Sequence, residues 1–182
     1  MKTALVIIDI QNDYFPGGRH ELAGTHAAAD KAAMVLAAAR AKALPVVHVR
    51  HISTYEGATF FLEGSEGSLI HECVAPLAGE TVIIKNMPNS FVATDLEAIL
   101  REANIDTIVF CGMMSHMCVD STVRAAADCG FSCIVAHDAC TTRDLVFAGE
   151  TVAAANVHTA FMAALDGVFA KVLRAEEAVG MI

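Results

Sequence analysis

The chain has 182 residues, which suits a single domain spanning residues 1–182 with a well-formed core. Its formal net charge of −9 argues against a nucleic-acid backbone or an anionic membrane surface as a partner. Charged residues make up 18% of the sequence, compared with roughly 25% in an average globular chain. This shortage favours a homo-oligomer, a dimer or tetramer, in which another subunit covers part of the surface.

The sequence shows no signal for export and no motif for a metal or a cofactor. Residues 1–5 run directly into an apolar segment without a cationic region or cleavage site, and no apolar stretch is long enough to cross a bilayer. We therefore expect a cytoplasmic protein. The six cysteines form no CxxC pair and no zinc-like spacing, and dinucleotide and Walker motifs are missing, so we expect no metal and no cofactor.

Strand and helix patterns alternate along the chain. Apolar runs predict strands buried on both faces at residues 4–10, 46–49, 82–84, 107–111 and 133–136, with a weaker one at 168–173. Helical patterns cover residues 25–43, 95–103, 119–129 and 149–165. Thr94 and Glu97 have the spacing of a capping box before the second helix, and Gly130 ends the third. The alternation predicts a three-layer α/β/α, Rossmann-like fold around a six-stranded, mostly parallel sheet.

Three reactive side chains follow or end predicted strands. In parallel sheets the functional groups gather at the carboxyl ends of the strands, where Asp9, Lys85 and Cys118 would meet. Cys118 lies at a strand-to-helix junction, where free N–H groups and the helix dipole favour a thiolate. Asp9 is costly to bury without a partner, which Lys85 can supply, and the pair can activate the thiol.

Ordinary structural roles explain each of these residues separately. An aspartate at a strand end is often a turn former, a lysine there is often solvated, and a cysteine at such a junction is often a core residue. The long excursion over residues 52–77, with little periodicity, is of the kind that often carries function. From spacing alone, the catalytic and the structural interpretations are about equally supported.

Three segments carry a resemblance to a known family, the isochorismatase-like cysteine hydrolases. The first is Val6-Ile7-Ile8-Asp9-Ile10-Gln11-Asn12-Asp13-Tyr14-Phe15. The second is Lys85 followed by Pro88-Asn89-Ser90-Phe91 and Thr94-Asp95-Leu96. The third is Gly112-Met113-Met114-Ser115-His116-Met117-Cys118-Val119-Asp120, followed by Arg124, Ala126, Gly130 and Asp138-Ala139. Each segment is moderately specific, but the three occur in family order across residues 4–170.

The resemblance implies a role for each matching residue. Asp9 becomes the general base, Lys85 its charge partner, and Cys118 the nucleophile that forms a thioester with the acyl group of a small amide. It also implies a cis peptide bond between Met113 and Met114, and an oxyanion hole made by the backbone N–H groups of Met114 and Cys118.

Differences between this chain and two branches of the family narrow the expected chemistry. Members that cleave a vinyl ether resemble the family but lack the cysteine, so Cys118 points to amide chemistry. Nicotinamidases resemble it with a metal site that includes an Asp-x-His, yet no aspartate occurs between Asp30 and Asp95 in this chain. His51 and His71 alone make a poor metal site, and we expect structural or pocket-lining roles for both.

Five residues are candidates for contact with the substrate, and each has an ordinary structural alternative. They are Gln11, Phe15, Phe91, Met113 and His116. Phe60 and Phe61 are further candidates for an apolar pocket wall. Two other functions stay open at this point. One is a thiol-based redox protein that uses Cys118, with Cys140 as a possible resolving thiol, and the other is a non-catalytic oligomer with the same fold.

Overall fold

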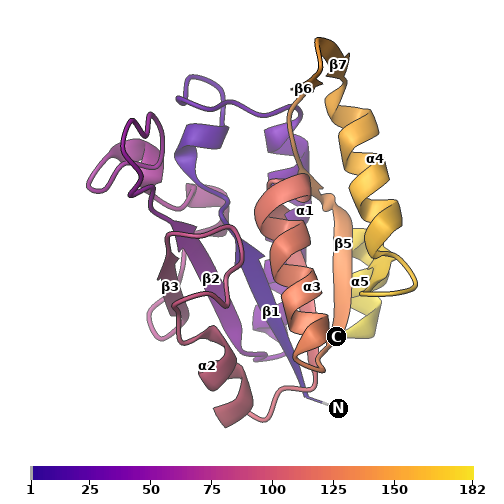
Figure 1. The fold of residues 1–182 in the computed structure, drawn as a ribbon. Helices are drawn as coiled ribbons and strands as arrows, with labels where there is room; N and C mark the ends of the chain where they lie inside the picture. Colours follow the sequence, from indigo (N-terminus) through magenta and orange to yellow (C-terminus); the bar gives the residue numbers. More distant parts are fainter. Residues whose placement is uncertain (1) are drawn as a thin grey trace.

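The computed structural model describes residues 2–182 and has one central, fully parallel sheet (Figure 1). The sheet has six strands in the order β3-β2-β1-β4-β5-β8. In chain order these strands are β1 (Thr3–Ile8), β2 (Val46–His51), β3 (Thr81–Lys85), β4 (Thr107–Met113), β5 (Ser132–Thr141) and β8 (Lys171–Leu173). A separate hairpin consists of β6 (Leu145–Phe147) and β7 (Glu150–Val152). The predicted α/β/α fold is confirmed.

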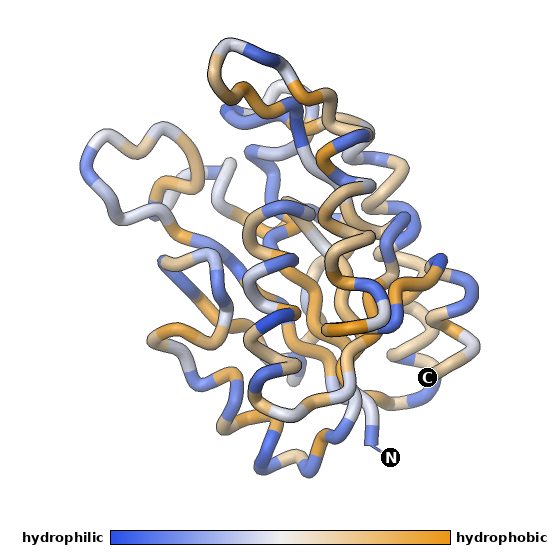
Figure 2. Tube along the Cα trace, turned by 45° about the vertical axis from the view of Figure 1, so that its right-hand side comes forward, coloured by the Kyte–Doolittle hydropathy of each residue, from blue (hydrophilic) through white to orange (hydrophobic). Residues whose placement is uncertain are grey.

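Helices cover both faces of the sheet and give the protein its three layers (Figure 1). One apolar core joins the sheet to α1 (Thr25–Ala41) and α5 (Ala175–Met181). The core on the opposite face joins it to α2 (Leu96–Glu102), α3 (Asp120–Asp128) and α4 (Ala154–Leu165). Hydrophobic residues run along the central strands and hydrophilic ones through the turns (Figure 2). Among residues 2–182, no helix has the length and apolar character that a membrane crossing needs.

The burial of each strand follows its place in the sheet. In the central strands β1 and β4, nearly every side chain is buried, as expected for strands covered by helices on both faces. The edge strand β3 differs from the prediction, because Val82 is 46% exposed and Ile84 is 57% exposed. β3 therefore has one uncovered, apolar face.

Several element boundaries also differ from the prediction. The helix expected at residues 149–165 begins only at Ala154, because the β6–β7 hairpin occupies residues 145–152. Helix α5 was not predicted, and the weak strand expected at 168–173 is reduced to β8. The capping box is wrong: Asp95 is the N-cap of α2, while the Thr94 hydroxyl donates to Ser90 O and accepts from Leu96 N.

Candidate active site

The carboxyl ends of three strands bring Asp9, Lys85 and Cys118 together. Asp9 directly follows β1, and Lys85 is the last residue of β3. Cys118 lies in a π-helical turn, η4 (Ser115–Val119), between β4 and α3. The Lys85 Nζ atom is 2.8 Å from Oδ2 of Asp9 and 3.2 Å from Sγ of Cys118. The predicted trio therefore forms one cluster, in which a base, a cation and a thiol are in contact.

The Lys85 ammonium is the centre of this cluster. Besides Asp9 and Cys118, it donates to Nδ1 of His51 and to the carbonyl oxygen of Met87, both at 3.1 Å. Burial by itself lowers the pKa of Lys85, but the charges of Asp9 and Cys118 outweigh burial and raise its pKa overall. The ammonium therefore stays charged. The pKa of His51 is lowered by burial and then by Lys85, so His51 is a neutral acceptor.

The structure corrects the expectation that the helix terminus makes Cys118 a thiolate. Burial, followed by the charge of Asp9, raises the pKa of Cys118, and the opposing effect of Lys85 does not reverse this shift. Cys118 is only 6% exposed and lies inside a π-helical turn instead of at the start of α3. The resting site therefore holds a protonated thiol next to an Asp9–Lys85 ion pair.

Asp9 has an acceptor oxygen available for that thiol proton. Its carboxylate is fully buried, and neither oxygen has a hydrogen bond of regular geometry within residues 2–182, so the contact with Lys85 is one of charge. One ligand atom each from Asp9, His51 and Cys118 lies within 4.8 Å of the others. The carboxylate therefore lies beside the Cys118 thiol, and its charge raises the pKa of that thiol.

The backbone around the site has an unusual conformation at three places. Asp9 has a φ of +50°, a left-handed conformation that costs a non-glycine residue energy and often occurs at functional sites. The peptide bond between Met113 and Met114 is cis. At Gly112, with a φ of +138°, a Cβ atom would lie 2.0 Å from the carbonyl oxygen of Ile8. Only glycine allows β4 to pass β1 this closely next to the site.

Two side-chain contacts hold the turn that carries Cys118. The Ser115 hydroxyl is 2.8 Å from Nδ1 of His158 in α4. On the other side of the turn, Nδ1 of His116 is 2.5 Å from the Thr142 hydroxyl after β5. Turn η4 is thus fixed to the two segments beside it, which limits the movement of Cys118.

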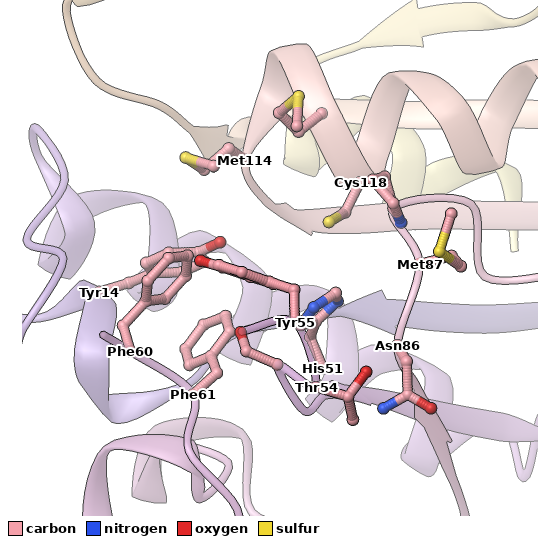
Figure 3. A pocket seen from close by; sticks show the side chains of 13 residues that line it. Tyr14, His51, Thr54, Tyr55, Phe60, Phe61, Asn86, Met87, Met114 and Cys118 are labelled. Carbon is pink, nitrogen blue, oxygen red and sulfur yellow. The ribbon is translucent and has the colours of Figure 1, made fainter. Parts of the chain in front are cut away.

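A cavity of about 400 Å³ opens in front of Cys118 (Figure 3). Its lining is mostly aromatic and apolar and consists of Tyr14, His51, Ser53, Thr54, Tyr55, Phe60, Phe61, Asn86, Met87, Pro88, Met114, Met117 and Cys118. The long excursion over residues 52–77 supplies five of these residues, including both predicted phenylalanines. Its volume is within the range of small-molecule sites, and Cys118 is part of its wall.

Asp13 and Tyr14 build the aromatic wall of the cavity, a role that was not predicted for either residue. The buried Asp13 carboxylate accepts hydrogen bonds from Phe61 N at 2.6 Å and Arg19 N at 3.2 Å. The Tyr14 ring contacts that of Phe61 edge-on, with centroids 4.6 Å apart. Both residues lie a few positions after Asp9 in the first motif. This closeness in sequence was the available signal that they belong to the site.

None of the five predicted substrate-contact residues is among those lining the cavity. Gln11 donates from its amide to His51 O and Ser68 O, and so joins β2 to the long excursion. Phe15 stacks on His71 with centroids 3.6 Å apart.

The other three of these residues pack elsewhere around the site. Phe91 stacks on Phe131. Met113 is fully buried in the core, and His116 holds the turn that carries Cys118. Their direct contact with a substrate stays a prediction.

The only metal-like cluster of residues 2–182 contains Asp9, His51 and Cys118. The Lys85 ammonium already lies between these groups, at 2.8 to 3.2 Å from an atom of each. A metal ion bound there would have to displace a buried ammonium. The donor set therefore does not fit a metal while Lys85 is in place.

Known proteins share this chain's sequence and fold. The isochorismatase domain matches residues 3–177. The uncharacterised isochorismatase family protein YddQ of Bacillus subtilis is 51% identical over 176 residues, which cover 97% of this chain and 98% of YddQ. The crystal structure of a protein from Oleispira antarctica, assigned to the isochorismatase hydrolases, has a TM-score of 0.95 at 51% identity, covering 98% of this chain and 96% of that one.

A relative with a named activity is more distant. Maleamate amidohydrolase of Pseudomonas putida is 32% identical over 151 residues, which cover 75% of this chain and 71% of that enzyme. The domain match spans the strands and turns that carry Asp9, Lys85 and Cys118. Sequence and fold therefore agree: this chain belongs to the isochorismatase family of hydrolases.

Proposed function

We propose that this protein hydrolyses the C–N bond of a small amide through a thioester on Cys118. The observation that carries the proposal is the buried cluster in which Lys85 Nζ contacts both the Asp9 carboxylate and the Cys118 sulfur. A thiol, a nearby base and a cation at the end of an apolar cavity are the groups that acyl transfer requires. The similarity to maleamate amidohydrolase supports amide chemistry.

In the first step, Asp9 takes the thiol proton while Sγ of Cys118 bonds to the amide carbon. The carbonyl electrons move to oxygen, and the backbone N–H groups of Met114 and Cys118 stabilise the resulting oxyanion. Both residues line the cavity. When the oxyanion collapses, the C–N bond breaks, and the amine leaves with the proton that Asp9 had taken. The positive charge of Lys85 stabilises the negative charge of the Asp9 carboxylate and of the developing thiolate.

Water completes the reaction. Asp9, again a carboxylate, takes a proton from water as the oxygen bonds to the thioester carbon. Collapse of this second intermediate breaks the C–S bond, and the sulfur recovers its proton from Asp9. The carboxylic acid product then leaves, and the thiol and the ion pair are restored.

A redox function for Cys118 fits the site less well. Sensor cysteines are exposed and have lowered pKa values, because peroxide reacts with the thiolate. Cys118 is buried, and burial together with Asp9 raises its pKa. A thiol that ionises only when a base accepts its proton next to a bound substrate suits acyl transfer better.

The proposal is tested by measuring ammonia release from a panel of small primary amides. Wild-type protein is compared with Cys118→Ala and Asp9→Asn, and Cys129→Ala is the matched control for loss of a thiol outside the cavity. We expect release by wild type and Cys129→Ala, and none above background by the other two. Undiminished release by Cys118→Ala would overturn the proposal.

We also infer that the protein forms a homo-oligomer, since apolar side chains are exposed at two places. Val146 and Phe147 of the β6–β7 hairpin are 71% and 82% exposed, and β3 exposes Val82 and Ile84. Light scattering coupled to size exclusion tests this. We expect a dimer or tetramer for wild type and a smaller species for Phe147→Ser or Ile84→Lys. A monomeric wild type at micromolar concentration would contradict it.

A further inference from the structure

We propose that the cavity in front of Cys118 selects uncharged amides whose acyl part is apolar, and discriminates against substrates that carry a carboxylate. This inference rests on the proposed amide hydrolysis and names the class of substrate. It separates this chain from maleamate amidohydrolase, since maleamate is an anion. The walls of the cavity, the charges behind it and the residues at its rim determine this selectivity.

The cavity walls contain no charged side chain. Among the 13 lining residues there is no aspartate, glutamate, lysine or arginine, and the five polar ones other than His51 and Cys118 carry uncharged hydroxyl, amide or phenol groups. His51 is neutral, because burial and Lys85 lower its pKa. A carboxylate that entered the cavity would lose water without gaining a counter-charge there, and this is strongly unfavourable.

The charges behind the cavity are already paired. Lys85 is the only cation in the cluster, and its ammonium has contacts with Asp9, His51, Met87 O and Cys118 at 2.8 to 3.2 Å. The three N–H groups thus have hydrogen-bond partners in His51, Met87 O and Cys118, and the charge is paired with Asp9. No N–H of Lys85 remains for a carboxylate of the substrate, and Asp9 would repel such a group.

The walls match an apolar acyl group instead. Tyr14, Phe60 and Phe61 form an aromatic cluster with ring centroids 4.6 to 6.2 Å apart. Figure 3 shows this cluster on one side of the cavity, with Met114 and Cys118 on the other. Aromatic rings and flexible methionine side chains pack well against an aromatic or branched aliphatic group held between them.

Arg143 is the main argument for the opposite specificity. It is exposed, and its charge reaches the cavity wall: it partly opposes the upward pKa shift of Tyr14 and contributes to lowering the pKa values of His20 and His116. Arg143 does not line the cavity, however, and an exposed charge is largely screened by solvent. We therefore assign Arg143 to the rim, outside the volume that holds the acyl group.

The test compares two alkylating agents of nearly equal size, uncharged iodoacetamide and anionic iodoacetate. In both reactions the Cys118 sulfur bonds to carbon, iodide leaves, and the thiol proton passes to Asp9 or solvent. Peptide mapping gives the rate at Cys118 for each reagent, and the same ratio measured in urea-unfolded protein supplies the intrinsic preference. We expect the ratio of the iodoacetamide rate to the iodoacetate rate to be at least about tenfold higher in the folded protein than in the unfolded one.

Substitution of Met117, which lines the cavity and is 40% exposed, provides a matched pair. Met117→Lys places a cation at the wall and should raise the rate of iodoacetate relative to iodoacetamide. The uncharged Met117→Gln should keep the wild-type preference for iodoacetamide. Equal folded and unfolded ratios in wild type would overturn the inference. So would a preference for iodoacetate that disappears in Arg143→Gln, because Arg143 would then be the anion site.

This result is independent of amide turnover. Hydrolysis of phenylacetamide is compared with that of its 4-carboxy derivative, and we expect the uncharged amide to be preferred at least about tenfold. Preference for the carboxylated amide would overturn charge selection while amide hydrolysis stands. Selective alkylation without hydrolysis of any amide would instead remove the proposed function and leave the charge selection of the cavity intact.

Discussion

The ammonium nitrogen of Lys85 lies 2.8 Å from the Asp9 carboxylate, and both side chains are fully shielded from solvent. Two opposite charges in such a place depend on each other, since removal of one leaves the other buried without compensation. The same pair faces the Cys118 sulfur. Stability and reactivity of the site are therefore linked through one contact.

Lys85→Met tests this dependence. The variant leaves the Asp9 carboxylate buried without a counter-charge, and we expect the free energy of unfolding to fall by about 3–5 kcal/mol. Asp9→Asn/Lys85→Met removes both charges and should regain much of that loss. Urea denaturation measures the wild type, both single variants and the double variant. A double variant as unstable as the sum of its single variants would show that the two charges do not depend on each other.

Asp9→Asn should have opposite effects on two reactions of Cys118. Asp9 raises the pKa of Cys118 and Lys85 lowers it, so loss of the carboxylate favours the thiolate. Alkylation of Cys118 by iodoacetamide at pH 7 should become faster, whereas amide hydrolysis should slow by about 10²–10⁴-fold because the general base is missing. Mass spectrometry and an ammonia assay measure the two rates. The control is Asp128→Asn, on the exposed end of α3.

The pH dependence of alkylation follows from the same shift. In wild type, the rate at Cys118 should rise with pH through a midpoint above the ordinary thiol pKa of about 8.5. Lys85→Met should move this midpoint higher, since Lys85 opposes the shift. A midpoint below 8.5 would contradict the upward shift of the Cys118 pKa, and one below about 7 would mean that Cys118 rests as a thiolate at neutral pH.

Gly112→Ala should destabilise the protein severely. A Cβ atom at this position would lie 2.0 Å from the Ile8 carbonyl oxygen, so β1 and β4 would have to separate next to the site. We expect a loss of about 3 kcal/mol or more. Gly130→Ala is the matched control: its φ is also positive, at +83°, but it has open space, so only the cost of the left-handed conformation, about 1–2 kcal/mol, applies. Equal losses of stability in the two variants, measured by thermal or urea unfolding, would contradict the close approach of β1 and β4 at Gly112.

Buried histidines should make the fold sensitive to mild acid. Burial lowers the pKa of His48, and Glu80 only partly opposes this shift. The unfolded chain binds a proton below about pH 6.5 while native His48 stays neutral, so stability is complete above that pH and falls below it. Each such histidine contributes up to about 1.4 kcal/mol per pH unit.

Urea denaturation at pH 7.5 and 5.5 measures this loss, and His48→Gln should reduce it. The Glu80 carboxyl group does not contribute to this loss, because it is protonated only at much lower pH. Its pKa is lowered to about 2, mainly by its hydrogen bond with Arg40. A fold that is equally stable at both pH values would contradict the assignment of neutral buried histidines.

The sheet and the clustering of Asp9, Lys85 and Cys118 could be predicted because both depend on local patterns. Continuous apolar runs indicate parallel strands, and polar residues at their ends must share one edge of the sheet, which brings Asp9, Lys85 and Cys118 together. The exposure of Val82 and Ile84 could not be predicted, since it depends on β3 being the edge strand.

The protonation state and the cavity depend on contacts that have no local pattern. The sequence suggests a helix terminus near Cys118, but burial against Asp9 decides the direction of its pKa shift. Tyr14 and Met117 reach the same cavity from segments about a hundred positions apart. The hydrogen bonds of Asp13 that place Phe61 likewise become visible only in the folded chain.

The most direct test of the central claim is to trap the acyl group. An activated, uncharged acyl donor, p-nitrophenyl benzoate, is mixed with the protein, and the reaction is quenched in acid and analysed by peptide mass spectrometry. We predict a burst of nitrophenol of about one equivalent per chain, with benzoyl on Cys118 in wild type and Cys129→Ala and on no residue in Cys118→Ala. Steady turnover without acylated Cys118, or an undiminished burst in Cys118→Ala, would contradict a thioester mechanism.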